Sequence, residues 1–241
     1  MTAPDEATGS DAPALSMRDV LFRYRATGFS IHVPSFDLER GGRVFLRGPS
    51  GSGKTTFLSL ATGLLRADGG TVAVGGEPMP RGAARRDRLR ADRIGVIHQQ
   101  FNLLPFLDTL SNVLMPFAFG RSRENAGDEA ARDLLSRLGV PEALHGAKAG
   151  TLSVGQQQRV AIARALVGAP ALVVADEPTS ALDTDARDAF LDLLFDNVAR
   201  AGASLLMVSH DEAIGRRFDR RHDLGDIATV HRSGEAHEAA A

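Results

Sequence analysis

The segment GPSGSGKTT, residues 48–56, follows the apolar run RVFLR and is the strongest structural signal in the chain. It matches the phosphate-binding pattern G-x-x-x-x-G-K-[ST], in which backbone N–H groups surround the phosphates of a nucleotide. Lys54 is placed to reach the β- and γ-phosphates, and the Thr55 hydroxyl is placed to hold Mg²⁺. A chance match in a chain of this length has odds on the order of one in a hundred, which disfavours a simple glycine turn. The expected nucleotide-binding residues are Gly48, Pro49, Ser50, Gly51, Ser52, Gly53, Lys54, Thr55 and Thr56.

Short apolar runs bounded by turn residues alternate with longer helical patterns along the chain. Such alternation is typical of buried parallel strands linked by crossover helices. Besides RVFLR, the runs predicted to form these strands are IGVIH, ALVVA, SLLMVS and, last, IATVH. The sequence therefore predicts an α/β fold with a mostly parallel core sheet.

The pattern between Gln99 and Ser153 changes to helices and loops, and DEAARDLLSRL is its clearest amphipathic segment. We expect a helical subdomain over about residues 100–165, inserted into a sheet domain that spans residues 15–232. Residues 1–14 and 233–241 are expected to be flexible tails. The first of these lacks the basic region and apolar core of a signal peptide.

Composition limits the classes of function. The 28 Lys and Arg residues nearly balance the 30 Asp and Glu residues of the 241-residue chain, so a surface that coats nucleic acid is not expected. Six arginines over residues 81–93 are interleaved with Asp87 and Asp92, which favours a solvated helix face, and RRFDRRHD is interpreted in the same way.

There is no cysteine, and no apolar run approaches the roughly 20 residues of a spanning helix. Any role in transport must therefore be shared with another polypeptide.

Two predicted strands end in residues suited to phosphate chemistry. ALVVA is followed by Asp176 and Glu177, and open α/β sheets bind ligands beyond such strand ends. Asp176 is suited to holding Mg²⁺ through water, and Glu177 to orienting or deprotonating the attacking water. The alternative is an acidic helix start before Pro178. SLLMVS delivers His210, which is either a structural histidine or a hydrogen-bond donor to a γ-phosphate.

The segment LSVGQQQR, residues 152–159, opens a predicted helix. Ser153 followed by Gln156 forms a capping-box pattern, so a well-capped helix start is the simplest interpretation. The same helix start is also an anion site, because its free N–H groups and positive dipole end attract phosphate.

Taken together, these motifs resemble the nucleotide-binding subunit of an ABC transporter over about residues 14–232. In this resemblance GPSGSGKTT corresponds to Walker A, LVVADE to Walker B with Glu177 as the catalytic carboxylate, and LSVGQ to the family signature. The resemblance assigns further roles to single residues: Asp183 ends the D-loop, His210 is the switch histidine, Gln99 contacts Mg²⁺ and water, and Tyr24 stacks on adenine.

The resemblance implies a fold, a second subunit and two ligands. The fold is a P-loop NTPase with an N-terminal antiparallel β part and an inserted helical subdomain. Two subunits, forming a homodimer, enclose two ATP molecules with Mg²⁺, and Ser153, Gly155 and Gln156 face the γ-phosphate held by the partner's Lys54. The sequence departs from the family at Val154, where glycine is common; this adds bulk and stiffness at the first helical turn.

The resemblance also implies a membrane permease as partner, and hence a location on the cytoplasmic face of the membrane. Residues 99–119 are expected to receive a permease helix, with Leu103, Leu104 and Phe106 as the contacts. The chain is similar to the branch that includes lipoprotein-release and macrolide-export ATPases, the LolD/MacB type. An alternative is an ATPase that drives a membrane partner controlling cell-wall hydrolases. DNA-repair ATPases are disfavoured, because no long coiled coil fits between Lys54 and Ser153.

Overall fold

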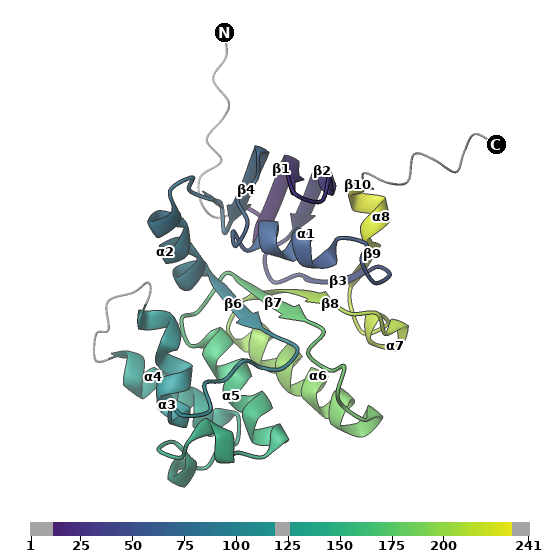
Figure 1. The fold of residues 1–241 in the computed structure, drawn as a ribbon. Helices are drawn as coiled ribbons and strands as arrows, with labels where there is room; N and C mark the ends of the chain where they lie inside the picture. The colour runs from purple at the N-terminus through teal and green to yellow at the C-terminus, as the bar shows by residue number, and fades with distance from the viewer. Residues whose placement is uncertain (1–11, 119–125, 233–241) are drawn as a thin grey trace, which may run out of the picture.

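The computed structural model describes residues 12–118 and 126–232, which form two five-stranded sheets and the helices around them (Figure 1). Residues 1–11 of the predicted N-terminal tail, and the whole predicted C-terminal tail at residues 233–241, lie outside the described residues. Ala14, the last residue of the expected N-terminal tail, is buried, and its backbone hydrogen-bonds to Leu38 and Gly75. Among the described residues, no helix is both long and apolar enough to span a bilayer.

The central sheet is parallel and has the order β6-β7-β8-β3-β9. Four of its strands are those predicted from apolar runs. Their bounds are Arg43–Arg47 for β3, Ile94–Ile97 for β6, Leu172–Asp176 for β7 and Ser204–Val208 for β8. The edge strand β9, Arg220–Asp223, contradicts the prediction of a helix face over RRFDRRHD. An edge strand pairs through its backbone, so it does not need the apolar side chains that sequence patterns detect.

The second sheet is antiparallel in its described pairings and confirms the expected antiparallel β part. Its order is β10-β2-β1-β4-β5, with bounds Leu15–Arg23 for β1, Ser30–Leu38 for β2, Gly69–Val74 for β4, Glu77–Pro78 for β5 and Thr229–His231 for β10. The prediction that IATVH is a parallel strand is therefore wrong. The short helix α8, Leu224–Ile227, follows β9 and carries the chain to β2, where β10 pairs in the opposite direction.

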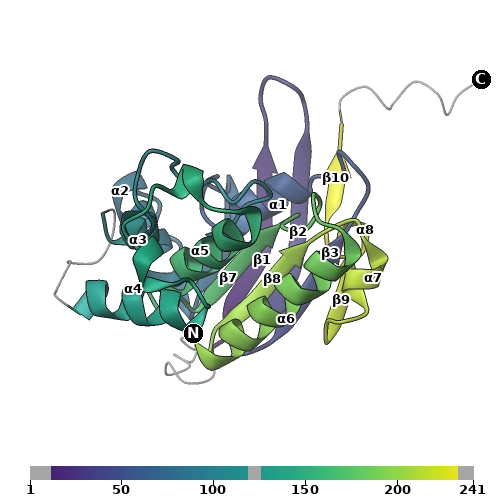
Figure 2. The same cartoon turned by 90° about the horizontal axis from the view of Figure 1, so that it is seen from below.

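Two hydrophobic cores lie on the two faces of the parallel sheet. Alternate strand residues point to opposite faces, so Val173 belongs to one core and Val174 to the other. The first core lies under helices α5, Val154–Leu166, and α6, Thr184–Arg200, and Figure 2 shows both helices across β7 and β8. The second core lies between the two sheets and contains much of α1, Lys54–Ala61.

The chain between β6 and β7 is largely helical in its described part, as predicted. It contains α3, Thr109–Leu114, α4, Ala126–Arg137, and α5, with 3₁₀ turns at Met115–Ala118, Glu142–Leu144 and Ala149–Thr151. The amphipathic prediction for α4 is confirmed, because Leu134 and Leu135 are buried and charged side chains cover its other face. The arginine-rich segment before β6 forms α2, Ala83–Arg93, which buries only Leu89 and is the predicted solvated helix.

Candidate nucleotide site

The predicted phosphate-binding and catalytic residues come together at one edge of the parallel sheet. Four neighbouring strands run in the same direction, so their carboxyl ends meet at this edge. Gln99 follows β6, Asp176 ends β7, His210 follows β8, and the P-loop follows β3. Ser209 N–H donates to Leu46 O at 3.3 Å, which ties the end of β8 to β3. Residues far apart in sequence thus share one surface, the place where open α/β sheets bind ligands.

The P-loop has the backbone geometry that its glycines permit. Gly53, the N-cap residue immediately before α1, adopts φ 103°, a conformation that side chains rarely tolerate. A Cβ on Gly48 would lie 2.6 Å from Ser52 Oγ, so the loop closes tightly only with glycine there. The Lys54 ammonium donates to the carbonyl oxygens of Gly48 and Pro49 at 2.6 and 2.9 Å. Thr55 is exposed beside it, whereas Thr56 is buried and belongs to the helix packing.

Asp176 lies in an environment that disfavours its own charge. Burial raises the pKa of Asp176, the adjacent Glu177 carboxylate raises it further, and the Lys54 ammonium partly opposes both effects. A bound cation would therefore find a carboxylate whose charge is only partly compensated by the protein.

Glu177 and His210 are in direct contact. His210 Nδ1 lies 2.8 Å from Glu177 Oε2, and Ser209 Oγ lies 3.5 Å from the same oxygen. The backbone of Glu177 has φ 48°, an unusual value for a residue with a side chain, and its N–H donates to Val208 O at 2.9 Å. The carboxylate is largely buried and the imidazole is largely exposed. The two side chains, which were predicted from separate strands, therefore form one hydrogen-bonded pair.

Tyr24 lies in an aromatic cluster beside the P-loop. Its ring packs edge-on against Phe22 at 4.7 Å between centroids and lies 5.9 Å from Phe29. A Cβ on Gly53 would lie 3.2 Å from the Phe29 ring, so this cluster borders the start of α1. Tyr24 remains partly exposed and is available for stacking.

The signature residues form the predicted helix cap. Ser153 Oγ accepts from Gln156 N–H at 3.3 Å, and Gln156 Oε1 accepts from Ser153 N–H at 2.9 Å, which completes the capping box. Ser153, Val154 and Gly155 are exposed, and a Cβ on Gly155 would meet nothing within 4 Å. No hydrogen bond or ion pair joins residues 153–156 to the P-loop within the described part of the chain. Asp183 is likewise exposed and caps α6.

The residues expected to contact a permease differ in their exposure. Phe106 is 67% exposed, but Leu103 packs against the hydrophobic core. A groove of about 570 Å³ is lined by His98, the residue before Gln99, but by neither Leu103 nor Leu104. Its walls come from α2, β6, the loop after β6, the 3₁₀ turn at Met115–Ala118 and α5, and include Arg90, Val96, His98, Asn102, Met115, Pro116 and Arg164. Burial first, and the Arg164 charge second, lower the pKa of His98.

Three arginines near the site were not singled out from the sequence. Arg47 ends β3 and pairs with Asp223 at 2.8 Å and with Glu212. Arg187 on α6 binds Asp211, which follows His210. Arg232 donates to the P-loop carbonyl of Gly51. Arg47 is recognisable as the residue before the P-loop, but no local pattern indicates the partners of Arg187 and Arg232, which lie far along the chain.

A phosphate-binding loop between β3 and α1, with carboxylates at the end of the neighbouring β7, defines a P-loop nucleoside triphosphatase. The chain belongs to the ABC transporter family, whose model matches residues 31–180. It is an ATP-binding and ATP-hydrolysing subunit of the kind that dimerises and works with a membrane permease.

Two curated relatives match along most of their length. The chain is 44% identical over 197 residues to the lipoprotein-releasing system ATP-binding protein LolD 2 of Rhodospirillum rubrum, covering 80% of this chain and 84% of the relative. It is 39% identical over 228 residues to the lipoprotein-releasing system ATP-binding protein LolD of Roseobacter denitrificans, covering 90% of this chain and 99% of the relative.

Solved structures share the fold. The dimeric structure of MJ0796, a bacterial ABC transporter cassette, superposes with a TM-score of 0.74 at 30% identity, covering 90% of this chain and 98% of that one. A dimeric post-hydrolysis state of the same cassette, bound to ADP and Pi, gives a TM-score of 0.72 at 32% identity, covering 87% and 93% of the two chains.

Proposed function

We propose that two copies of this chain close on two MgATP molecules and drive a separate permease that releases or exports lipoproteins or other lipophilic substrates. The observation that carries the proposal is the convergence of the P-loop, Asp176, Glu177 and His210 at the ends of adjacent parallel strands. The lipoprotein-releasing relatives support the substrate class.

The P-loop residues fit a nucleotide phosphate. Ser52 Oγ is buried and has no hydrogen-bond partner among the described residues, so a phosphate oxygen would satisfy it. Lys54 now donates to two loop carbonyls and can exchange these bonds for stronger ones to charged oxygens.

Mg²⁺ is the expected companion of the phosphates, held by Thr55, Asp176 and Gln99. The described residues contain no cluster of three or more His, Cys, Asp or Glu side chains able to hold a metal alone. This suits Mg²⁺, which is usually held by one or two carboxylates together with substrate phosphates. When bound, the ion neutralises charge that develops on the phosphates.

Hydrolysis depends on the pair of Glu177 and His210. Glu177 orients the attacking water and accepts its proton. An ionised carboxylate only accepts hydrogen bonds, so His210 Nδ1 carries the proton in their 2.8 Å contact. A second hydrogen bond from His210 Nε2 to a phosphate oxygen then requires the protonated ring. His210 thus positions Glu177, and the protonated ring also binds the γ-phosphate.

A second subunit supplies what one chain lacks. Ser153, Gly155 and Gln156 lie at the exposed start of α5, where free N–H groups attract anions. We expect this helix start to complete the site formed by the P-loop of the other copy, with Asp183 close to the same interface and Tyr24 stacked on adenine. Each of the two ATP molecules is then held by both chains.

The groove beside Gln99 is the proposed binding site for a permease helix. Val96, Met115 and Pro116 supply apolar contact, while Arg90 and Arg164 add positive charge at its walls. An amphipathic helix fits such a groove through its apolar face. In this proposal, the permease holds the subunit on the cytoplasmic face of the membrane. Phe119, at the end of the segment predicted for docking, lies outside the described residues.

Substitution of Glu177 by Gln tests the proposed chemistry. The variant should bind MgATP but hydrolyse it very slowly, because the attacking water loses its base. Trapped ATP should then hold two copies together, and size-exclusion chromatography with light scattering should show a dimer that separates when ATP is removed. Glu142→Gln, an exposed acid in the helical region, is the matched control and should behave as the wild type.

A Glu177→Gln variant that stays monomeric and hydrolyses ATP at the wild-type rate would overturn both the role of Glu177 and the shared site. Purification of the chain from its source in mild detergent tests the transport role. A co-purifying permease that releases lipoproteins supports it, whereas an associated cell-wall hydrolase supports the alternative of a membrane partner that moves no substrate.

A further inference from the structure

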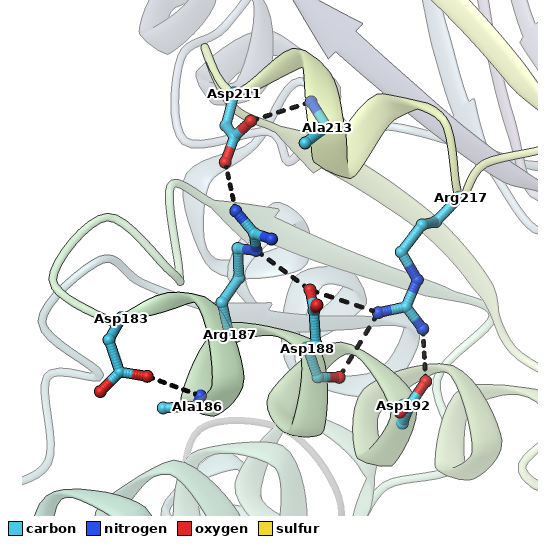
Figure 3. A network of polar contacts seen from close by, with 8 residues as sticks. All are labelled: Asp183, Ala186, Arg187, Asp188, Asp192, Asp211, Ala213 and Arg217. Atoms are coloured by element: carbon cyan, nitrogen blue, oxygen red, sulfur yellow. Dashed lines mark hydrogen bonds and ion pairs between the residues drawn. The ribbon is translucent and has the colours of Figure 1, made fainter.

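The two residues that follow His210 are each held by an arginine. Arg187 Nη1 on α6 donates to Asp211 Oδ2 at 3.0 Å, as Figure 3 shows. Arg47, at the end of β3, pairs with Glu212. His210 itself is 71% exposed, and its Nδ1 lies against the Glu177 carboxylate. With so little packing of its own, the imidazole takes its position largely from the backbone that these arginines hold.

Asp211 is the more tightly fixed of these two neighbours. One of its carboxylate oxygens accepts from Arg187, and the other accepts from Ala213 N–H at 2.8 Å and so caps the short helix α7, Glu212–Gly215. Its own N–H donates to Ser209 Oγ at 3.2 Å. Movement of the Asp211 carboxylate would therefore disturb the backbone on both sides of it, including His210.

Arg187 connects this segment to the start of α6. The Asp183 side chain accepts from Ala186 N–H at 2.8 Å, and the backbone N–H of Arg187 donates to Asp183 O at 2.9 Å. A side-chain cap and a backbone hydrogen bond therefore both hold the first turn of α6. The Arg187 side chain is only 19% exposed, and its Nε also donates to Asp188 at 3.1 Å. These two carboxylates fix the direction of the guanidinium fork.

We propose that Arg187 is a positioning residue for His210, and that it transmits the placement of Asp183 at the subunit interface to the Glu177–His210 pair. The inference rests on the proposed function, in which His210 and Glu177 act on the attacking water. Closure of a second subunit against the Asp183 turn would shift the first turn of α6 as a unit. Arg187 and Asp211 then carry that shift to the imidazole.

The test compares Arg187→Gln with Arg217→Gln in steady-state ATP hydrolysis. Arg217 binds Asp188 and Asp192 in the same network and stacks on Phe195. Within the part of the chain that the structure describes, no hydrogen bond or ion pair joins the Arg217 side chain to Asp211, so Arg217 is a matched control. Arg187→Gln should lower kcat about ten- to a hundredfold, because small misplacement of a catalytic group has effects of this size, and KM should stay within about twofold. Arg217→Gln should keep kcat within about twofold of the wild type.

Rescue separates positioning from general destabilisation. Arg187→Lys keeps a charge that reaches Asp211 but loses the fork, so it should recover part of kcat. Equal loss of kcat in Arg187→Gln and Arg217→Gln, or no recovery with lysine, overturns the inference.

His210→Ala distinguishes the two levels of the proposal. If it abolishes hydrolysis while Arg187→Gln keeps the wild-type kcat, Arg187 has no positioning role and the proposed function stands. If His210→Ala itself hydrolyses ATP normally, the proposed role of His210 is wrong, and the inference falls with it.

Discussion

Gly155→Asp is expected to stabilise the isolated chain and at the same time to abolish its ATP-driven dimerisation. Gly155 is the second residue of α5, and a Cβ there meets nothing within 4 Å. Aspartate has a higher helix propensity than glycine by a few tenths of a kcal/mol. A negative charge in the first helical turn adds about 0.3 to 1 kcal/mol through the helix dipole. The free energy of unfolding should therefore rise by about 1 kcal/mol, or about 2 to 4 °C in Tm for a chain of this size.

The opposite effect is expected once a partner subunit presents ATP. If Gly155 lies against the γ-phosphate, the new carboxylate is held near a like charge. Two unit charges 4 Å apart in an effective dielectric of about 20 repel by about 4 kcal/mol, which corresponds to about a thousandfold loss of affinity. Dimerisation should be followed by light scattering in the Glu177→Gln background, where bound ATP persists.

Two control variants separate the effect of the negative charge from the effect of its position. Gly155→Asn adds a side chain of similar size without charge and should weaken dimerisation far less. Gly146→Asp places the same charge in the helical region, where a Cβ also meets nothing within 4 Å, and should leave dimerisation unchanged. If Gly155→Asp raises Tm and still dimerises on ATP, the start of α5 is a helix cap only, and the shared-site model is refuted.

Other predictions concern the signature, the groove and acid stability. Val154→Gly should keep or modestly raise ATPase activity, because the valine is exposed and Ser153 still caps the helix; a large loss of kcat would contradict this. Met115→Asp should prevent co-purification with the permease, because it buries a charge in the groove, while ATP hydrolysis persists. The control Leu21→Asp, at an exposed leucine that does not line the groove, should still co-purify; unchanged co-purification of Met115→Asp would place docking elsewhere. Burial first, and Arg220 second, lower the pKa of His222, with Asp226 opposing. The unfolded chain therefore binds the proton more readily, and the free energy of unfolding should fall as pH drops below the ordinary value of 6.5. His222→Gln should show a weaker fall in Tm between neutral pH and about pH 5; an unchanged slope would show that other groups carry it.

Several elements follow from the sequence because their causes are local. The glycines and Lys54 of the P-loop specify a turn whose chemistry lies within nine residues, and the capping box of Ser153 and Gln156 spans a single helical turn. The buried strands β3, β6, β7 and β8 are marked by apolar runs, because both of their faces pack against other elements.

Other features could not be predicted because their causes are distant in the chain. The residues of β9 are mostly polar and pair with β3 through backbone bonds that no periodicity encodes. The direction of β10 depends on which sheet it reaches, and β2, its partner, lies about 200 residues earlier. An apolar residue such as Leu103 is expected both in a hydrophobic core and at a docking surface, and only the packing of the folded chain distinguishes the two.

Three features could be predicted from the sequence because a few consecutive residues specify each of them: the phosphate-binding loop, the strand-end carboxylates and the capped start of α5. Two contacts are visible only in the folded chain: Glu177 meets His210 because β7 and β8 lie side by side, and Arg187 meets Asp211 because of where α6 packs. Local sequence motifs show which functional residues are present. The distances between those residues depend on the order of the strands in the sheet, and that order depends on the packing of the whole chain.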